Sequence, residues 1–341
     1  MSARESIIPV FVPHLGCPND CVFCNQRRIT GSERPATAQT VAEAIERASA
    51  LPCGGAKRQL AFYGGSFTAI PACEQEELLC AAQRYLERGE IDSIRLSTRP
   101  DAIDGATLRR LREHGVETIE LGAQSLDDEV LRLSGRGHTA RDVVDASEAI
   151  KAAGFSLVLQ MMTGLPGDSD EKDVRTARGV IALGPDAVRI YPTVIVRDTA
   201  LYDLWRAGLY TEHSVEDAVR VCAVLLPMFE TAGIPVIRLG LNPTEELSGG
   251  AAAGGAYHPA LGELVRSRIM LNKARAILAA VPAGSRVSLG VSPARISQMT
   301  GQHRQNVRTL CDDFSLRALR IVPTDAADGE IRILSVETDG E

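Results

Sequence analysis

Three cysteines near the N-terminus, Cys17, Cys21 and Cys24, are spaced C-x3-C-x2-C within the stretch FVPHLGCPNDCVFCN, residues 11–25. Three thiolates this close together on one loop can hold three irons of a cubane [4Fe–4S] cluster. A fourth cysteine at matched spacing is missing, so one iron stays open to another ligand. The spacing therefore predicts a cluster that binds and activates a molecule, rather than one that only carries electrons.

The main alternative for the same cysteines is a structural zinc site, in which His14 supplies the fourth ligand of tetrahedral zinc. The order H-x2-C-x3-C-x2-C is an unusual zinc spacing, and structural zinc loops normally pair two short cysteine groups. The cluster is thus the favoured interpretation, to be tested by its surroundings. The other five cysteines lack such spacing and are interpreted as small buried apolar residues: Cys53, Cys73, Cys80, Cys222 and Cys311.

Apolar runs typical of strands alternate with helical patterns from residue 7 to residue 231. Six strand–helix units in strict alternation predict an α/β fold with a parallel sheet, although the alternation does not decide between an open sheet and a barrel. In either case ligands gather at the carboxyl ends of the strands. Unusual residues fall at those ends: the cysteine loop, Gly64-Gly65, Ser97-Thr98-Arg99, Gln124, Gln160 and Tyr191-Pro192.

We expect three parts along the chain. Residues 1–247 form the core, and residues 248–280 complete it with a flexible glycine-rich stretch, SGGAAAGGA, and a helix. Residues 281–341 form a small basic C-terminal α/β domain, expected to bind nucleic acid.

The composition is that of a soluble globular protein, with 45% hydrophobic and 24% charged residues among 341. No apolar run reaches membrane-spanning length, and the N-terminus MSARESIIPV lacks a secretory signal pattern. We therefore expect a cytoplasmic protein with reduced thiols and no membrane partner.

Basic residues are concentrated between residues 263 and 320, although the net charge of the whole chain is −7. Only Glu263, Asp312 and Asp313 oppose them in that segment. The ten basic residues are Arg266, Arg268, Lys273, Arg275, Arg286, Arg295, Arg304, Arg308, Arg317 and Arg320. Such segregation of charge indicates a polyanionic partner.

Residues 7 to about 275 resemble the radical S-adenosylmethionine (SAM) superfamily. The likeness is strongest to the radical SAM domain of the Elongator catalytic subunit, and to stand-alone bacterial proteins of that type. It is carried by RPDAI, IELGAQSLDDEVL, RGHTARDV, AGFSLVLQMMTGLPG, RIYPTVIVRDTALYDLWRAGLY and HPALGELVRSRIM. Oxygen-independent coproporphyrinogen III oxidase is a more distant resemblance. The acetyltransferase domain that follows in Elongator has no counterpart in these 341 residues.

This resemblance implies a partial (β/α)6 TIM-like barrel of the radical SAM type, a [4Fe–4S] cluster on Cys17, Cys21 and Cys24, and SAM on the open iron. Gly64 and Gly65 would approach the methionine part of SAM, and Arg136 its carboxylate. The full set of expected SAM-binding residues is Phe11, Phe23, Gly64, Gly65, Ser66, Ser97, Gln124, Arg136, Gln160 and Tyr191. Ser66 and Ser97 stand where relatives carry acidic residues, and Gln124 and Gln160 correspond to ribose contacts.

The resemblance and the basic segment together imply an RNA substrate of the tRNA type. The resemblance also implies a low-potential electron donor of the flavodoxin or ferredoxin type. SPARISQMTGQHRQNVRTL resembles a helix-turn-helix, and GQHR resembles a KH-type loop in which Arg304 replaces the second glycine. The expected substrate-binding residues are His138, His258, Arg295, Arg304 and Arg308. Two alternatives stay open: an enzyme that modifies a small molecule such as a tetrapyrrole, and a non-enzymatic metal-containing protein that binds nucleic acid.

Overall fold

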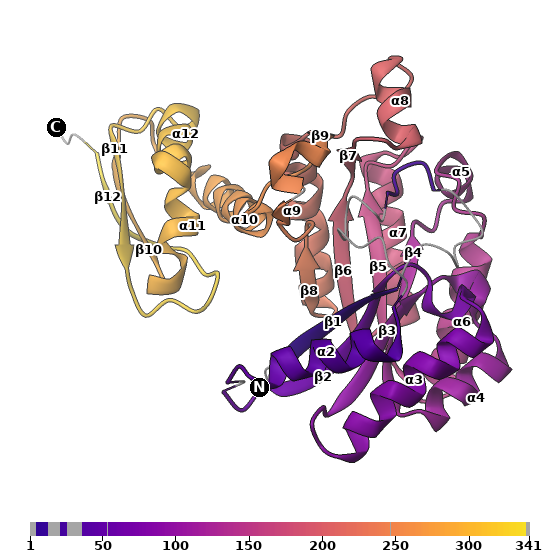
Figure 1. The fold of residues 1–341 in the computed structure, drawn as a ribbon. Coiled ribbons are helices and arrows are strands. Elements are labelled where there is room, and N and C mark those ends of the chain that lie inside the picture. Colours follow the sequence, from indigo (N-terminus) through magenta and orange to yellow (C-terminus); the bar gives the residue numbers. More distant parts are fainter. Residues whose placement is uncertain (1–4, 13–20, 26–35, 53, 246, 339–341) are drawn as a thin grey trace. The chain divides into compact units, whose positions relative to one another are not determined.

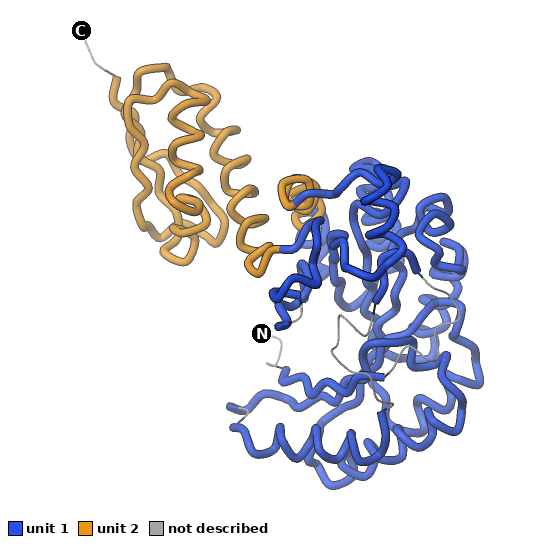
Figure 2. Tube along the Cα trace, turned by 45° about the horizontal axis from the view of Figure 1, so that its top comes forward, with its two compact units in different colours: residues 1–214, 228–257 blue, residues 215–227, 258–341 orange. Residues whose placement is uncertain are grey.

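The computed structural model describes residues 5–12, 21–25, 36–52, 54–245 and 247–338. The chain divides into two compact units, which Figure 2 shows in different colours. Unit 1 comprises Met1–Ser214 and Met228–Tyr257, and unit 2 comprises Val215–Pro227 and His258–Glu341. Within the described ranges, every helix is too short or too polar to cross a membrane.

Unit 1 is built on a seven-stranded sheet in the order β1-β2-β3-β4-β5-β6-β8, and every pair of neighbours is parallel. The sheet curls into an open half barrel (Figure 1), which confirms the predicted partial barrel. The strands are β1 (Glu5–Val12), β2 (Lys57–Gly64), β3 (Ser93–Thr98), β4 (Val116–Gln124), β5 (Ser156–Thr163), β6 (Ala187–Pro192) and β8 (Val236–Leu239).

The seventh strand, β8, is an element that the sequence pattern did not predict. It has only four residues, VIRL, and none of them is fully buried, so its apolar signal is weak. It forms because β6 offers an open edge, against which Arg189 pairs with Arg238 and Ile190 pairs with Leu239.

Helices connect the strands and are defined by local capping residues. Thr37 and Thr139 each form a capping box that begins a helix, and Gly184 ends another in the left-handed conformation. The helices named in Figure 1 from this part of the chain are α2 (Ala38–Ser49), α3 (Ala72–Glu87), α4 (Gly105–Glu113), α5 (Asp128–Leu133), α6 (Ala140–Ala152), α7 (Asp170–Leu183), α8 (Ala200–Arg206) and α9 (Val215–Thr231).

The two faces of the sheet differ in chemistry because side chains alternate along each strand. Leu96 of β3 and Ile119 of β4 are fully buried and lie opposite each other in the ladder. The adjacent positions, Arg95 and Glu120, are charged and also buried. Aliphatic packing therefore fills one face, while charged and polar side chains occupy the other.

The glycine-rich stretch that we expected to be flexible is an ordered element. Strand β9 (Ala252–Gly255) pairs antiparallel with β7 (Val194–Val196), after a helical turn over Leu247–Ala251. A Cβ atom on Gly255 would lie 2.7 Å from the Thr193 carbonyl oxygen. Small residues are needed here because the two backbones approach closely, so composition alone gave the wrong interpretation.

Unit 2 contains a three-stranded sheet in the order β11-β10-β12, parallel between β10 and β11 and antiparallel between β10 and β12. Its elements are α10 (Leu261–Leu278), β10 (Arg286–Val291), α11 (Ile296–Thr300), α12 (Gln305–Asp313), β11 (Ala318–Pro323) and β12 (Arg332–Glu337). The core joins Leu271 and Leu278 of α10 to Leu289 and Leu310.

The domain boundaries proposed at residues 247 and 280 do not coincide with these units. Helix α10 was expected to complete the barrel core; the buried side chains of its second half, from Met270 to Leu278, pack with β10 and α12.

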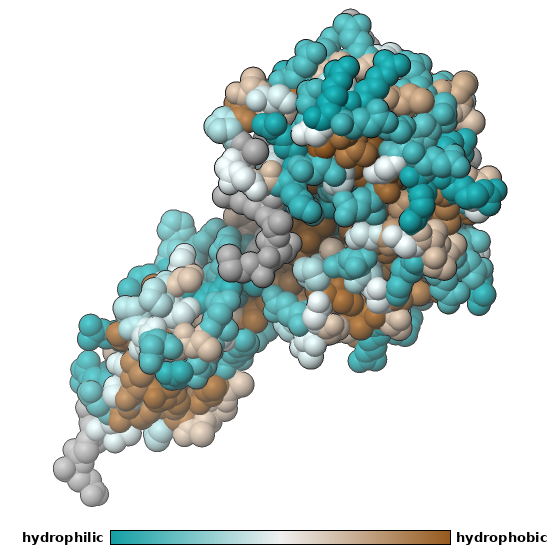
Figure 3. Space-filling view, turned by 90° about the horizontal axis from the view of Figure 1, so that it is seen from below, coloured by the Kyte–Doolittle hydropathy of each residue, from teal (hydrophilic) through white to brown (hydrophobic). Residues whose placement is uncertain are grey.

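An apolar patch is visible on unit 2 in Figure 3, and strand β12 exposes Ile333, Leu334 and Val336.

Candidate active site

Several residues that the sequence singled out meet at the carboxyl ends of the parallel strands. The ladder between β1 and β2 brings Phe11 opposite Tyr63 and Val12 opposite Gly64. In the sequence, the cysteine segment follows β1 directly. Cys17 and His14 lie outside the described residues, while Cys21 and Cys24 are described.

The segment around Cys21 is fixed by backbone hydrogen bonds on both sides. The Val22 amide donates to the Ser134 carbonyl at 3.1 Å, and the Leu201 amide donates to the Val22 carbonyl at 2.7 Å. A turn closes between Cys24 and Cys21, whose N–H···O=C distance is 2.9 Å. These bonds place the segment between the end of α5 and the start of α8.

An apolar cluster anchors the same segment through Phe23. This side chain packs, together with Tyr191, against Val130, Met162 and Leu165. The aromatic residue between the last two cysteines thus ties the loop to β5 and β6. Tyr191 also accepts a hydrogen bond from the Arg189 guanidinium at 3.1 Å.

Two buried arginines face the Cys21 sulfur. Arg136 Nη1 lies 3.2 Å from Cys21 Sγ, and Arg99 Nη1 lies 4.0 Å from it. Arg99 is held by paired contacts to the Asp101 carboxylate at 2.9 and 3.1 Å, and it also donates to the Arg136 carbonyl. Positive charge and N–H donors of this kind stabilise a thiolate and the sulfurs of a cluster.

The glycine turn after β2 has a clear steric reason. Gly64 has φ +100°, and a Cβ there would lie 2.7 Å from the Val12 carbonyl oxygen. The Ser66 hydroxyl contacts the Thr98 hydroxyl at 2.9 Å and accepts from the Arg99 amide at 3.2 Å. Gly65 donates to Val12 O at 2.9 Å. The turn therefore packs the end of β2 onto the end of β1 and onto β3.

Gln124, at the end of β4, has two properties typical of a ligand-binding residue. Its φ is +65°, an uncommon conformation for a residue with a side chain. Its Oε1 atom is buried and has no hydrogen-bond partner among the described residues. Gly122 makes room for it, because a Cβ there would lie 3.0 Å from Gln124 Nε2 and 3.3 Å from Arg136 Nη2. A hydroxyl donor of a bound cofactor fits this arrangement.

His138 is buried and contacts the backbone next to Gln124. Its Nε2 lies 3.2 Å from the Ala123 carbonyl oxygen and donates to it. Burial, with the nearby Arg136 charge, lowers the pKa of His138 to about 4, so the imidazole is neutral at physiological pH. The geometry makes His138 a support for the backbone beside Gln124; contact with a substrate remains only a prediction.

A cluster of polar side chains centred on Glu120 lies on the inner face of the half barrel. The fully buried Glu120 carboxylate accepts from Tyr63 Oη at 2.8 Å, Arg95 Nη1 at 3.0 Å, Arg189 Nη2 at 2.8 Å and Gln160 Nε2 at 3.0 Å. Burial and the Glu120 charge raise the pKa of Tyr63, so its hydroxyl remains a donor. Five neighbouring strands, β2 to β6, contribute one residue each.

Sequence reasoning predicted Gln160 as a site residue and missed the other four members of this cluster. A usable signal was present: Arg95, Glu120 and Arg189 are charged residues in the middle of otherwise apolar strands. Ser97 lies opposite Glu120 in the β3–β4 ladder. Its expected contact with SAM stays a prediction.

The expected substrate-binding residues of unit 2 have local partners of their own. His258 Nδ1 accepts from the Ala260 amide at 3.1 Å, just before α10 begins. Arg295 forms a paired contact with Asp328 at 2.5 and 2.7 Å, and Arg308 donates to the His303 carbonyl at 3.0 Å. Arg304 occupies the turn before α12 with φ +61°.

Comparison with known proteins places these features in a family. Residues 11–178 match the model of the radical SAM superfamily, and residues 185–270 match the radical SAM C-terminal domain. Human Elongator complex protein 3 is 34% identical over 152 residues, which cover 43% of this chain and 28% of that protein.

A second relative is the tRNA uridine(34) acetyltransferase of Methanocaldococcus infernus, 32% identical over 129 residues, covering 37% of this chain and 24% of that protein. The chain thus spans about a quarter of the length of these curated relatives.

The archaeal Elp3 of Methanocaldococcus infernus, solved with an N-terminal deletion, has a similar fold. The TM-score is 0.62 at 21% identity, covering 83% of this chain and 67% of that one. Both family models match in tandem over the cysteine loop and the curled parallel sheet, and the chain therefore belongs to the radical SAM superfamily.

Proposed function

We propose that this radical SAM enzyme modifies RNA, with a transfer RNA as its substrate. The observation that carries the proposal is the similarity to relatives named for tRNA uridine(34) acetylation and to Elongator complex protein 3. The arrangement of unit 2 supports it independently.

Unit 2 favours the KH-type interpretation of GQHR over the helix-turn-helix. The turn Gly301–Arg304 joins α11 to α12, and this helix pair connects the parallel strands β10 and β11. In KH domains a GXXG loop between two helices clamps the nucleotide backbone. His303 and Arg304 both have positive φ here, 49° and 61°. The arginine thus adopts the conformation for which glycine is usually selected, and it brings a positive charge to the turn.

The residues of unit 1 fit the cofactors that the superfamily uses, a [4Fe–4S] cluster and SAM. Cys17, Cys21 and Cys24 would hold three irons, and Arg99 and Arg136 would donate to the sulfurs at Cys21. Bound together and reduced, these cofactors would supply the radical chemistry of the superfamily, which is hydrogen-atom abstraction by a carbon radical.

The remaining site residues would position and shield the reacting groups. The buried Oε1 atom of Gln124, which has no hydrogen-bond partner in the part of the chain that the structure describes, is available to accept from a ribose hydroxyl. The hydrogen-bonded side chains of the Glu120 cluster fill the inner face of the sheet. They would exclude water from it and present dipoles of fixed orientation. The protein's part is to hold, orient and exclude water, while the cofactor carries the radical chemistry.

The proposal includes two further elements. The electron donor is a low-potential protein of the flavodoxin or ferredoxin type, because a cluster of this class needs a strong reductant. The enzyme works in the cytoplasm, where a reduced cluster and tRNA are found together.

The test has two parts, one on the purified protein and one on cells that lack the gene. Protein prepared without oxygen should hold about four irons per chain and release 5′-deoxyadenosine from SAM, and replacing Cys17, Cys21 and Cys24 by alanine should abolish both. Mass spectrometry of bulk tRNA should show a modified nucleoside that disappears in the deletion strain. The wild-type gene should restore that nucleoside, whereas the triple-alanine gene should not.

The two parts of the proposal fail in different ways. Stoichiometric zinc without iron after anaerobic reconstitution would contradict the assignment of the cluster. Normal SAM cleavage with unchanged tRNA nucleosides would instead contradict the RNA substrate and favour a small molecule.

A further inference from the structure

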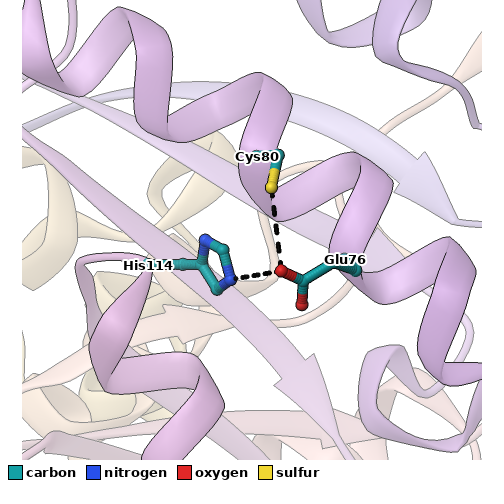
Figure 4. Close-up of side chains that lie close together, drawn as sticks. All are labelled: Glu76, Cys80 and His114. Carbon is teal, nitrogen blue, oxygen red and sulfur yellow. Dashed lines mark hydrogen bonds and ion pairs between the residues drawn. The ribbon is translucent and has the colours of Figure 1, made fainter.

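A second group of metal-ligating side chains joins α3 to the end of α4 (Figure 4). Glu76 and Cys80 are one helical turn apart on α3, and His114 directly follows α4. His114 Nε2 lies 3.1 Å from Glu76 Oε1, and Cys80 Sγ lies 3.8 Å from the same oxygen. All three donor atoms lie within 4.8 Å of one another.

The hydrogen bonds around His114 determine which ring nitrogen carries a proton. Its Nδ1 lies 2.8 Å from Gln83 Oε1. The Gln83 amide nitrogen donates to Glu87 at 3.1 Å, which turns the amide oxygen toward the histidine. Nδ1 must therefore be the donor. In the neutral imidazole the lone pair of Nε2 then faces the Glu76 carboxylate, a contact that is favourable only with a cation between the two atoms or a proton on the ring.

We propose that Glu76, Cys80 and His114 bind a Zn²⁺ ion, with water as the fourth ligand. Imidazole nitrogen, thiolate and carboxylate oxygen are the donors that zinc takes in proteins, with bonds of about 2.0–2.3 Å. In a tetrahedral centre such bonds set the donors about 3.3–3.6 Å apart. The distances of 3.1 and 3.8 Å from Glu76 Oε1 to the other two donors bracket this range. Cys80 Sγ and His114 Nε2 lie within 4.8 Å of each other, so side-chain rotations must bring that pair closer when the ion binds.

The surroundings suit a stable ion that water can still reach. Gln83 acts as the outer partner that orients a metal-bound histidine. The Glu76 side chain is 51% exposed and that of His114 11%, so the ion has an entry path. Cys80 is half-buried beside the Glu76 carboxylate, so its sulfur can be reached by an ion that enters from the solvent side. The ion would tie α3 to α4 on the outer side of the sheet.

This inference also changes the interpretation of the isolated cysteines. Cys73 was expected to be buried, but it is exposed on α3, and Cys80 is half-buried; Cys222 is buried as expected. Cys73 provides a matched control, because it lies on the same helix and outside the group of three.

The first experiment measures metals in the full-length protein after anaerobic cluster reconstitution. We expect one zinc per chain in addition to the cluster iron. Cys80→Ser and His114→Gln should each lose the zinc and keep the iron, whereas Cys73→Ser should keep both. Gln83→Leu should weaken zinc binding about 10–100-fold, because the histidine loses its orienting partner.

The second experiment uses Co²⁺ as a spectroscopic probe in full-length protein whose cluster cysteines are replaced by alanine. Tetrahedral cobalt bound to a thiolate gives a charge-transfer band, which zinc should remove by competition and Cys80→Ser should abolish. An unchanged band in Cys80→Ser would overturn the proposal. So would the absence of both zinc and cobalt binding in protein with a native circular dichroism spectrum, because the pair of Glu76 and His114 would then be a simple ion pair.

Discussion

The charged side chains compared here are buried in unit 1 and largely exposed to solvent in unit 2. In unit 1, Arg95, Arg99 and Arg136 are only 3–6% exposed, and each contacts a buried acceptor. In unit 2, the ion pair of Arg275 with Asp313 leaves both side chains about 40% exposed. Buried charges need fixed partners, whereas exposed pairs exchange readily with salt and with phosphate.

Ion pairs within unit 2 also change the estimate of how much positive charge the segment 263–320 presents to a partner. Arg268 pairs with Glu216 and Arg295 pairs with Asp328, and both acidic partners lie outside that segment. The excess positive charge is thus smaller in the folded unit than along the sequence. Arg304 of the turn and Arg308 of α12 become the better candidates for phosphate contacts.

The largest effect should come from removing the buried carboxylate. Glu120→Ala leaves the donors of Tyr63, Arg95, Gln160 and Arg189 without their shared acceptor, and we expect a loss of about 3–5 kcal/mol in the free energy of unfolding. Urea denaturation measures it. Glu120→Gln keeps the volume and one acceptor, so it should cost less. A loss below about 1 kcal/mol for Glu120→Ala would mean that solvent reaches these groups.

A smaller effect is expected at Arg136, which contacts both Cys21 and the Gly122 carbonyl. If it also meets the carboxylate of SAM, Arg136→Ala should weaken SAM binding by about 1.5–3 kcal/mol. Iron content should not change, because the cysteines hold the cluster. Calorimetry gives the affinity, with the exposed Arg304→Ala as control. Unchanged SAM affinity would limit Arg136 to its contacts within the protein.

The buried carboxyl of Asp173 should make the free energy of unfolding depend on pH. Burial is the larger cause and the Asp168 charge the smaller one; together they raise the pKa of Asp173 to about 10. An aspartate in an unfolded chain has a pKa of about 3.9. Between these values the folded state binds more protons than the unfolded state, so this carboxyl makes stability fall as pH rises. Asp173→Asn resembles the protonated form and should remove part of that fall.

The gain should be on the order of 1–2 kcal/mol at about pH 8 and close to zero at about pH 4. Urea midpoints at the two pH values provide the measurement. Glu171, which is exposed on the same first turn of α7, supplies the control Glu171→Gln, for which we expect little change at either pH. Equal effects of Asp173→Asn at both pH values would show that Asp173 is ionised in the folded protein.

The smallest effects should come from the exposed arginines of unit 2. Replacing Arg304 and Arg308 by alanine should lower the slope of log affinity for tRNA against log salt by about two units, about one per phosphate contact. Arg295→Ala should change the slope by less than one, because Asp328 already occupies that guanidinium. Asp328→Asn should release Arg295 and raise the slope. Equal slopes for all these variants would exclude unit 2 from RNA binding.

The cysteine loop, the alternation of strands and helices, and the glycine turn could all be read from the sequence. Each depends on residues close together in the chain: C-x3-C-x2-C is a local spacing, and Gly64-Gly65 is a local turn signal at the end of an apolar run. Local patterns of this kind depend on backbone geometry and hydrophobic periodicity, which do not require knowledge of distant partners.

Only the tertiary structure decided which charged residues meet. The Glu120 cluster draws on five strands spread from residue 63 to residue 189, and its members come together because the parallel ladders align them on one face. Strand β9 was misjudged for the same reason, since its pairing depends on the edge of β7. Register and edge pairing are properties of the whole sheet, and a one-residue slip would turn each of these side chains to the opposite face.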